Sequence, residues 1–414
     1  MKTGILFAGA ALTAAVWAFS SNAAGISVDT RIPAGCVKVV GVTNDVVTLT
    51  IDNRDSSAPW IYWAFRVTGA EGRTLRFAFT DRNAVGSRGA AVSTDLGATW
   101  TWSDDVMKGE PKDALGDHAS WREFNWTFAA DQREVWFSQM IPYGEREWKA
   151  FLARHEKDRG KVFETDELCR TRKGRSVEYA RFGRLDGQAK ERLFVTARHH
   201  CAEASASFVV EGMLEKFFAD DELGAWLREN MELRVVPFVD KDGVVDGDQG
   251  KGRRPWDPGR DYTDNREQRY PQVAAIMRMV REWRPTGMQD THSPWLRGNW
   301  TSPLNANEYC YQPYCIENAE KARVYGEIVQ RLSVGRMNYR VKDDYPFGKG
   351  WNTWRNYAQG ASIKGWASKS LPFVKLSTTW EIPFANQREK TLYPDDFRAF
   401  GGDVLAGWRE YLLR

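Results

Sequence analysis

The pattern of apolar residues changes near residue 145, and this change most restricts the fold. From residue 146 onward, apolar runs of strand length alternate with longer segments of helical period, as in "ERLFVTA" followed by "AEASASFVVEGMLEKFF". Strand and helix in alternation predict a mixed or mostly parallel sheet with helices on both faces. Because such sheets bind ligands at the carboxyl ends of their strands, functional residues are expected just after the apolar runs.

The segment before this change has a different pattern. Between Gly25 and Tyr143, short runs rich in Trp, Phe, Tyr and Val alternate with a period of two and are separated by turn residues, as in "VVTLTID", "TLRFAFTD" and "REVWFSQM". This pattern predicts an antiparallel β-sandwich. The expected organisation is a β-sandwich domain over residues 25–145, followed by an α/β domain with a mixed central sheet over residues 146–414.

The first 23 residues have the composition of a secretory signal. Lys2 precedes an apolar stretch from Gly4 to Phe19, and Ser21-Asn22-Ala23 resembles a small-residue cleavage site. A membrane anchor is the alternative, but it needs roughly 20 apolar residues, and Thr13 interrupts this stretch. The sequence therefore predicts a periplasmic or secreted protein without a membrane span after removal of the signal.

Composition argues against two classes of function. The formal net charge is only +3 and no basic tract is interleaved with aromatics, so a nucleic-acid partner is not expected. The five cysteines are scattered without a CxxC pattern, which argues against a cysteine zinc site. In an oxidising compartment Cys310 and Cys315 could close a short loop, and the odd count leaves a free thiol.

Residues that suit a metal ion follow directly after one apolar run. In "VTARHHCAEASASFVVEG", His200 and Glu203 are three positions apart at a strand end and helix start, a spacing that lets both side chains converge. Imidazole nitrogen and carboxylate oxygen are suitable zinc ligands, and a catalytic zinc takes three protein ligands and a water. A helix-start Glu that favours the helix dipole is the alternative interpretation.

Two later strand ends offer a third ligand and a base. Besides His118, His155, His199 and His200, the chain has His292, which ends the strand-like run "GMQDTH". Glu381 stands among apolar and β-branched neighbours in "FVKLSTTWEI", where a carboxylate could take a proton from an activated water. A strand Glu that points to solvent is the competing interpretation.

The order of these motifs resembles the zinc carboxypeptidases of the funnelin type: HxxE, "VVPFVDKDG", an arginine-rich loop, a strand-end His, and "STTWE" before a last helix. The first half, with "WIYWAFRV" and "VWFSQMIPYGEREWKAFL", is similar to the domain that precedes the catalytic unit in the cytosolic-carboxypeptidase-like branch. The resemblance implies one zinc ion held by His200, Glu203 and His292. It also implies hydrolysis of a C-terminal peptide or isopeptide bond by zinc-activated water, with Glu381 as general base.

The resemblance further implies an arginine that clamps the terminal carboxylate of the substrate, within an Asn-Arg pair. A bidentate guanidinium suits a carboxylate. In "RRPWDPGRDYTDNREQRYPQV" we align this pair with Gly259-Arg260, because Tyr262 follows within two residues. The literal pair Asn265-Arg266 is the alternative register.

A second family arginine stabilises the oxyanion, and Arg254 is the candidate for it, with Arg253 and Lys251 as rivals. The segment "YAQGASIKGWAS" resembles the part of the family fold that carries a substrate-capping tyrosine, here Tyr357. Lys364 and its neighbour Ile363 then lie near the specificity pocket.

Three functions follow from these observations. The first is an exported zinc metallocarboxypeptidase that removes a C-terminal residue, acidic or otherwise unusual, from a peptide or peptide-like substrate. The second is a zinc amidase or deacylase acting on cell-wall stem peptides or acyl amino acids, because Gly259 replaces the family Asn. The third is an inactive relative that binds peptide or glycan through its tryptophans, of which the chain has 19. The presence of all three ligands and the base favours an enzyme; the oligomeric state is not indicated.

Overall fold

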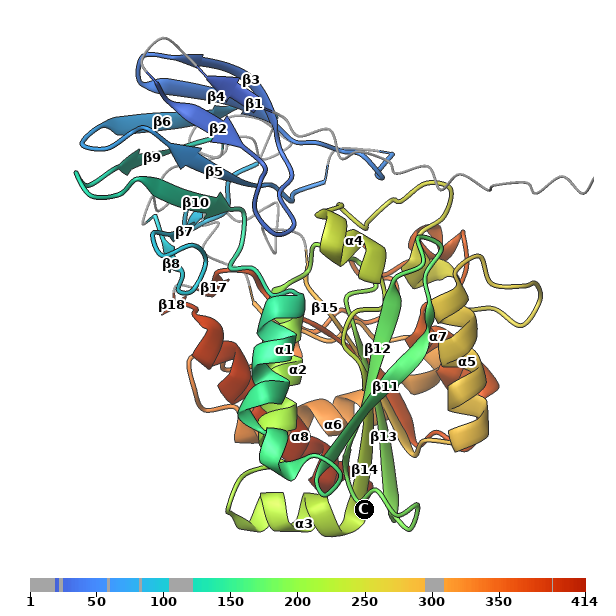
Figure 1. Cartoon of the computed structure of the whole chain (residues 1–414). Helices are drawn as coiled ribbons and strands as arrows, with labels where there is room; N and C mark the ends of the chain where they lie inside the picture. Colours follow the sequence, from blue (N-terminus) through green and yellow to red (C-terminus); the bar gives the residue numbers. More distant parts are fainter. Residues whose placement is uncertain are drawn as a thin grey trace, which may run out of the picture.

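The structure is a computed structural model that describes residues 19–21, 25–57, 60–81, 84–103, 122–294, 309–388 and 390–414. Figure 1 shows an all-β N-terminal part beside a larger part built of strands and helices. His118 and most of the expected leader lie outside the described residues. The leader residues that are described form β1 (Phe19–Ser21), which pairs with β2 (Ser27–Asp29).

The N-terminal part contains two sheets, with strand orders β1-β2-β5-β10-β7-β8 and β3-β4-β6-β9. Buried aromatic rings join them: the centroid of Phe77 lies 5.5 Å from that of Phe65 and 4.9 Å from that of Phe137, both in the other sheet. One pairing departs from the antiparallel expectation, because β4 and β6 are parallel and β5, between them in sequence, belongs to the other sheet. The strands are β3 (Lys38–Thr43), β4 (Val46–Thr50), β5 (Ala64–Thr68), β6 (Thr74–Phe79), β7 (Ala91–Ser93), β8 (Thr101–Trp102), β9 (Glu123–Thr127) and β10 (Glu134–Ser138).

The larger part is built on one six-stranded sheet of order β11-β12-β14-β13-β15-β16. The pairs β14–β13, β13–β15 and β15–β16 are parallel, whereas β11–β12 and β12–β14 are antiparallel, so the expected mixed sheet is confirmed. Its strands are β11 (Phe163–Arg170), β12 (Ser176–Gly183), β13 (Glu191–Ala197), β14 (Met231–Val236), β15 (Gly287–His292) and β16 (Leu376–Glu381).

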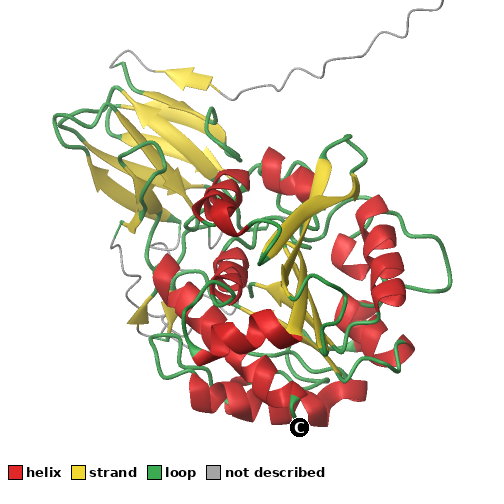
Figure 2. Ribbon diagram, turned by 60° about the horizontal axis from the view of Figure 1, so that its bottom comes forward, coloured by secondary structure: helices red, strands yellow, loops and turns green. Residues whose placement is uncertain are grey.

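Helices cover both faces of this sheet (Figure 2). Successive side chains of a strand point to opposite faces. Accordingly, Leu193 and Val195 of β13 pack in the core with α1, α2, α3, α6 and α8, whereas Phe194 packs in the core with α5 and α7. The helices are α1 (Glu145–Arg154), α2 (Ser205–Glu215), α3 (Glu222–Asn230), α4 (Lys241–Asp246), α5 (Pro271–Trp283), α6 (Ala319–Leu332), α7 (Ile363–Ser370) and α8 (Pro394–Leu412).

Helices α2 and α8 cross with their backbones in close contact. A Cβ atom at Gly212 would lie 2.0 Å from the carbonyl oxygen of Arg398, and one at Gly401 would lie 2.1 Å from that of Val209. Glycine, without a Cβ, permits this approach. Helix α8 therefore packs directly on the helix that follows the HxxE segment.

All five cysteines are free thiols, so the bridge considered between Cys310 and Cys315 is not formed. The Cys315 thiol instead donates a hydrogen bond of 2.9 Å to Oδ1 of Asn318. Among the described residues, no helix has both the length and the apolar composition that crossing a bilayer requires.

Candidate active site

Three neighbouring parallel strands end at one edge of the sheet, and each carries site residues there. Strand β13 ends at Ala197, shortly before His200, while β15 ends at His292 and β16 at Glu381. The register pairs Ala197 with Thr291, and His292 with Glu381. The sheet thus brings together side chains that are far apart in the sequence.

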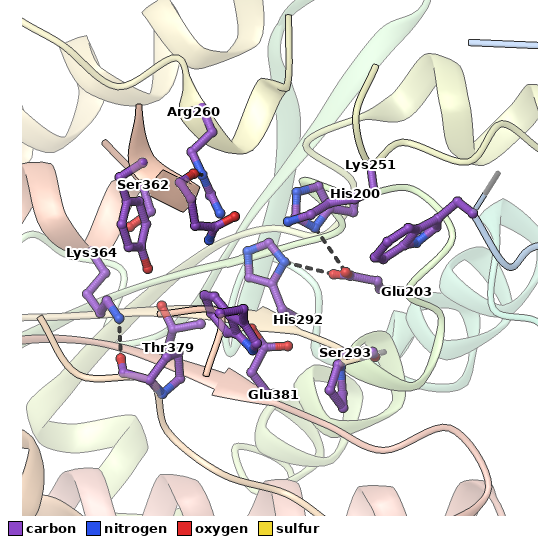
Figure 3. Close-up of a pocket in the computed structure, with 16 residues that line it drawn as sticks. His200, Glu203, Lys251, Arg260, His292, Ser293, Ser362, Lys364, Thr379 and Glu381 are labelled. Carbon is purple, nitrogen blue, oxygen red and sulfur yellow. Dashed lines mark hydrogen bonds and ion pairs between the residues drawn. The ribbon is translucent and has the colours of Figure 1, made fainter. Parts of the chain in front are cut away.

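The side chains of His200, Glu203 and His292 converge (Figure 3). Nδ1 of His200 lies 2.9 Å from Oε1 of Glu203, and Nδ1 of His292 lies 2.7 Å from Oε2. One donor atom from each of these buried residues lies within 4.8 Å of the others. Two imidazole nitrogens and one carboxylate in this span suit a zinc ion with a coordination position left open. The donor set therefore fits the expected metal.

A second carboxylate contacts the other nitrogen of each histidine. Nε2 of His200 lies 3.2 Å from Oδ1 of Asp257, and Nε2 of His292 lies 2.8 Å from Oδ2 of Asp290. Contacts of this kind fix the tautomer and the ring orientation of metal-binding histidines. Sequence reasoning did not assign either aspartate, although Asp290 is two residues before His292.

His199 also belongs to the group of residues that surrounds His200 and His292. Its Nδ1 lies 2.9 Å from Oδ1 of Asp290 and its Nε2 lies 2.6 Å from the hydroxyl of Tyr262. With Asp290 and His292 it forms a second compact donor group. Because neither His199 nor Asp290 is among the residues that line the cavity, this group serves better to support His292 than to hold a second ion.

The charged groups of the cluster shift the pKa values of one another. Burial acts to raise the pKa of Glu203, but the charges and hydrogen bonds of His200 and His292 outweigh burial and hold this pKa below its ordinary value. Burial acts to lower the pKa of His292, whereas Asp290 and Glu203 raise it well above its ordinary value.

Glu381 is buried beside the cluster. Burial raises the pKa of its carboxyl group to about 7, while His292 acts to lower this pKa and Glu203 to raise it. The backbone of Glu381 is also held from outside the strand, because its N–H donates to the carbonyl of Tyr311 over 2.9 Å. A carboxyl group with a pKa near neutrality can both accept and release a proton, as a general base requires.

A cavity of about 340 Å³ contains these groups. Its described lining includes three cations, Lys251, Arg260 and Lys364, and Figure 3 shows Arg260 and Lys364 on the side of His292 opposite Glu203. The other lining residues are Trp60, His200, Glu203, His292, Ser293, Pro294, Pro313, Trp351, Asn356, Tyr357, Ser362, Thr379 and Glu381.

Arg260 and Tyr357, both expected to bind substrate, line this cavity together. The guanidinium carbon of Arg260 lies 4.8 Å from the centroid of the Tyr357 ring. Arg266, from the alternative register, instead pairs with Asp261 at 2.7 Å and is not among the lining residues. The neighbouring Gly259 is closely confined, because a Cβ atom there would lie 3.1 Å from Nε2 of His200.

The structure does not bring Arg254 to the cavity. Its backbone N–H donates to the carbonyl of Asp55, and it lines a separate cavity. Of the three residues considered for this role, Lys251 is the one that lines the cavity together with His200, Glu203 and His292. The side chain of Arg253 is occupied by three carboxylates, those of Asp55, Asp240 and Asp248.

Two further lining residues are Lys364, which was expected near the specificity pocket, and Trp60, which had no assigned role. The Lys364 side chain is buried, its Nζ donates to the carbonyl of Pro313, and burial lowers its pKa to about 8. Trp60 comes from the N-terminal part. Its sequence context, a run of aromatics in a β-rich segment, gives no sign that it lies beside residues of the other part.

Similar proteins agree with this picture, although no family model matches the chain. Mouse cytosolic carboxypeptidase 3 is 24% identical over 266 residues, which are 59% of this chain and 26% of the mouse protein. Mouse cytosolic carboxypeptidase 6 is 22% identical over 175 residues, which are 40% of this chain and 32% of that protein. The matches thus span about a quarter to a third of the length of these relatives.

Solved structures share the fold over most of the chain. A metallo-carboxypeptidase from Burkholderia cenocepacia superposes with a TM-score of 0.72 at 18% identity, over 94% of this chain and 99% of that chain. The chain is therefore similar in sequence to the cytosolic carboxypeptidases and shares the fold of the metallo-carboxypeptidases. A second structure, the metallo-carboxypeptidase from Pseudomonas aeruginosa in complex with (2-guanidinoethylmercapto)succinic acid, gives 0.68 at 17% identity over 93% and 98%. The resemblance to zinc carboxypeptidases carried by the HxxE and "STTWE" motifs is thus confirmed, and the shared fold extends over most of the N-terminal part.

Proposed function

We propose that the protein is a zinc-dependent metallocarboxypeptidase that removes a C-terminal residue from a peptide or peptide-like substrate. The observation that carries this proposal is the cavity itself, where a His-Glu-His donor set, a buried carboxyl group and an arginine face one space. The relation to the carboxypeptidases supports it.

His200, Glu203 and His292 are the residues that would hold the zinc ion. When bound, zinc polarises the scissile carbonyl and lowers the pKa of the attacking water. Glu381 accepts the proton of that water and returns it to the leaving amine, for which a pKa near 7 is suitable. Asp257 and Asp290 keep the two imidazoles oriented while the proton moves.

Two cations orient the substrate. Arg260 binds the terminal carboxylate, with the Tyr357 ring beside it. Lys251 stabilises the negative charge that develops on the carbonyl oxygen. Burial, and then the charge of Arg260, lower the pKa of Lys251, and negative charge arriving in the cavity acts against this shift.

Lys364 favours an acidic C-terminal residue in the substrate. Its ammonium group is buried in the cavity and donates to a backbone carbonyl. No carboxylate among the described residues forms an ion pair with it. An unpaired buried cation is costly, and an acidic substrate side chain would supply a partner. Peptides that end in Glu or Asp are therefore the proposed substrates.

Mass spectrometry of a mixed peptide set tests the proposal. Each peptide is present with a free and an amidated C-terminus, and the protein is incubated with and without a chelator. We expect chelator-sensitive loss of single C-terminal residues from free peptides alone, fastest where that residue is acidic. Zinc retention without cleavage of either form would contradict a peptidase of this specificity.

The second candidate, an amidase or deacylase, is favoured by one observation. Gly259 places no amide side chain beside Arg260, where the family pattern has Asn. Cleavage of acyl amino acids or stem peptides but not of free-ended linear peptides would support this candidate. A protein that neither retains zinc nor cleaves any of these substrates would be a binding relative.

We also propose export, supported by the composition of the first 23 residues. Cleavage after Ala23 would remove β1 and leave β2 as the edge of its sheet. Intact-mass measurement of protein recovered from the cell envelope or medium tests this. Recovery of the complete chain from the cytoplasm would contradict it.

A further inference from the structure

The N-terminal part reaches the active site through one loop of the α/β part. Residues 248–254 follow α4, and Lys251 near the middle of this loop lines the cavity. The loop packs on the metal-ligand segment: Gly250 has a φ of +79°, and a Cβ atom there would lie 2.4 Å from the backbone nitrogen of Cys201. The backbone position of this loop therefore decides where the Lys251 ammonium group stands relative to the metal ligands.

The carboxylate of Asp55, in the N-terminal part, caps this loop. Its Oδ1 accepts the backbone N–H of Gln249 over 2.9 Å, and its Oδ2 accepts the backbone N–H of Gly250 and Nε of Arg253, each over 3.0 Å. The Asp55 side chain is only 11% exposed. Hydrogen bonds to an ionised group are strong, and little water competes for these.

The next two residues of the N-terminal part continue the contact. Ser56 donates from its Oγ to the carbonyl of Lys251 over 2.8 Å. Ser57 donates to the carbonyl of Gly252 from its backbone nitrogen over 3.0 Å and from its Oγ over 3.1 Å. The backbone at Lys251 and on both sides of it is thus bonded to the N-terminal part.

A reciprocal contact comes from the loop. The buried side chain of Gln249 accepts the backbone N–H of Tyr62 over 2.9 Å and donates to the carbonyls of Tyr62 and Asp52 over 2.8 and 3.1 Å. Trp60, two residues before Tyr62, itself lines the cavity. Displacement of the loop would break bonds in both directions.

We propose that Asp55 and Ser56 are positioning residues that hold Lys251 toward the reacting carbonyl, which makes the N-terminal part a working component of the active site. This inference rests on the proposed function, because it uses the role given there to Lys251. A lysine side chain is long and flexible, and a fixed backbone reduces the freedom that must be lost on reaching the transition state.

A double-mutant cycle tests the inference. Asp55→Ala should lower kcat/KM about tenfold, mainly through kcat, while zinc content stays unchanged. In a Lys251→Met background the same change should cost less than about twofold, because the residue through which Asp55 acts is already lost. Hydrogen exchange followed by mass spectrometry should show faster exchange over residues 248–254 in Asp55→Ala.

Arg88→Ala is the matched control. Its Nε donates to Oδ1 of Asn386 over 2.5 Å, so this variant removes a contact between the same two parts that does not involve residues 248–254. It should change neither kcat nor exchange over residues 248–254. If Asp55→Ala does not fold, Ser56→Ala repeats the cycle with an expected loss of about threefold.

Equal losses in the two Lys251 backgrounds would overturn the inference, as would unchanged exchange over residues 248–254 in Asp55→Ala. A wild-type protein that cleaves no peptide would instead contradict the proposed function. The exchange measurement needs no substrate, so it still decides whether Asp55 anchors the loop.

Discussion

His292 and Glu381 stand at paired positions where two neighbouring parallel strands end. Strands β15 and β16 keep this register from the pair Gly287–Leu376 onward. A proposed metal ligand and a proposed base therefore lie side by side on a rigid sheet edge, where loop motion has little effect on their separation. The roles of the two residues are separable by experiment.

Replacing Glu203 by Gln should prevent stable zinc binding. The carboxylate contacts both histidines, and an amide is neutral and a poor zinc ligand. We expect zinc affinity to fall at least about 100-fold, measured by competition with a chromogenic chelator. Retention of stoichiometric zinc by this variant, with Glu381→Gln as the control that should keep it, would exclude Glu203 as a ligand.

Replacing Glu381 by Gln should leave zinc bound and reduce catalysis. The amide keeps the shape of the side chain but cannot accept the proton of water, so kcat should fall by about 10²- to 10⁴-fold. The measurement is kcat and KM on the best peptide of the mixed set, with zinc content determined on the same sample. Activity within about tenfold of wild type would remove Glu381 from the role of base.

Replacing Lys364 by Met should change specificity more than activity. Met preserves length and apolar packing but cannot pair with a carboxylate. We expect kcat/KM for a peptide ending in Glu to fall about 100-fold, with a change below about threefold for the same peptide ending in Gln. Equal effects on both peptides would show that Lys364 does not contact the substrate side chain.

The preference for acidic residues should weaken in alkaline solution. Burial lowers the pKa of Lys364 to about 8, so its ammonium form is lost as pH rises through this value. The value of kcat/KM reports ionisations of the free enzyme. The ratio of kcat/KM for the peptide ending in Glu to that for the peptide ending in Gln should therefore fall above pH 8. A zinc ion bound nearby would lower the pKa of Lys364 further and move this fall to a somewhat lower pH. A ratio constant from pH 6 to 10 would contradict this, and Lys364→Met should show no such change.

Strands β13 and β16 were predictable because each is a bounded apolar run. "ERLFVTA" and "FVKLSTTWEI" give β13 and β16, and parallel pairing then places His200, His292 and Glu381 at one edge. Strand β11 was not predicted, because it lies at the sheet edge, most of its residues are exposed or half-buried, and so it lacks an alternating apolar pattern.

The choice among Lys251, Arg253 and Arg254 could not be made from the sequence. The loop that carries them has no period, and its path depends on hydrogen bonds to Asp55, which is remote in the sequence. Those contacts turn Arg253 toward the carboxylates and leave Lys251 at the cavity. A local pattern carries no information about such a contact.

The close crossing of α2 and α8 has a consequence for how the proposed metal site is assembled. Helix α2 begins two residues after Glu203, but the surface that packs against Gly212 comes from residues beyond Pro394. A nascent or truncated chain that lacks this segment would leave the glycine face of α2 in water. The segment that carries His200 and Glu203 therefore becomes fully rigid only after α8 has packed against α2. A premature stop codon that removes α8 should thus yield a protein that binds metal poorly, even though the histidines are present.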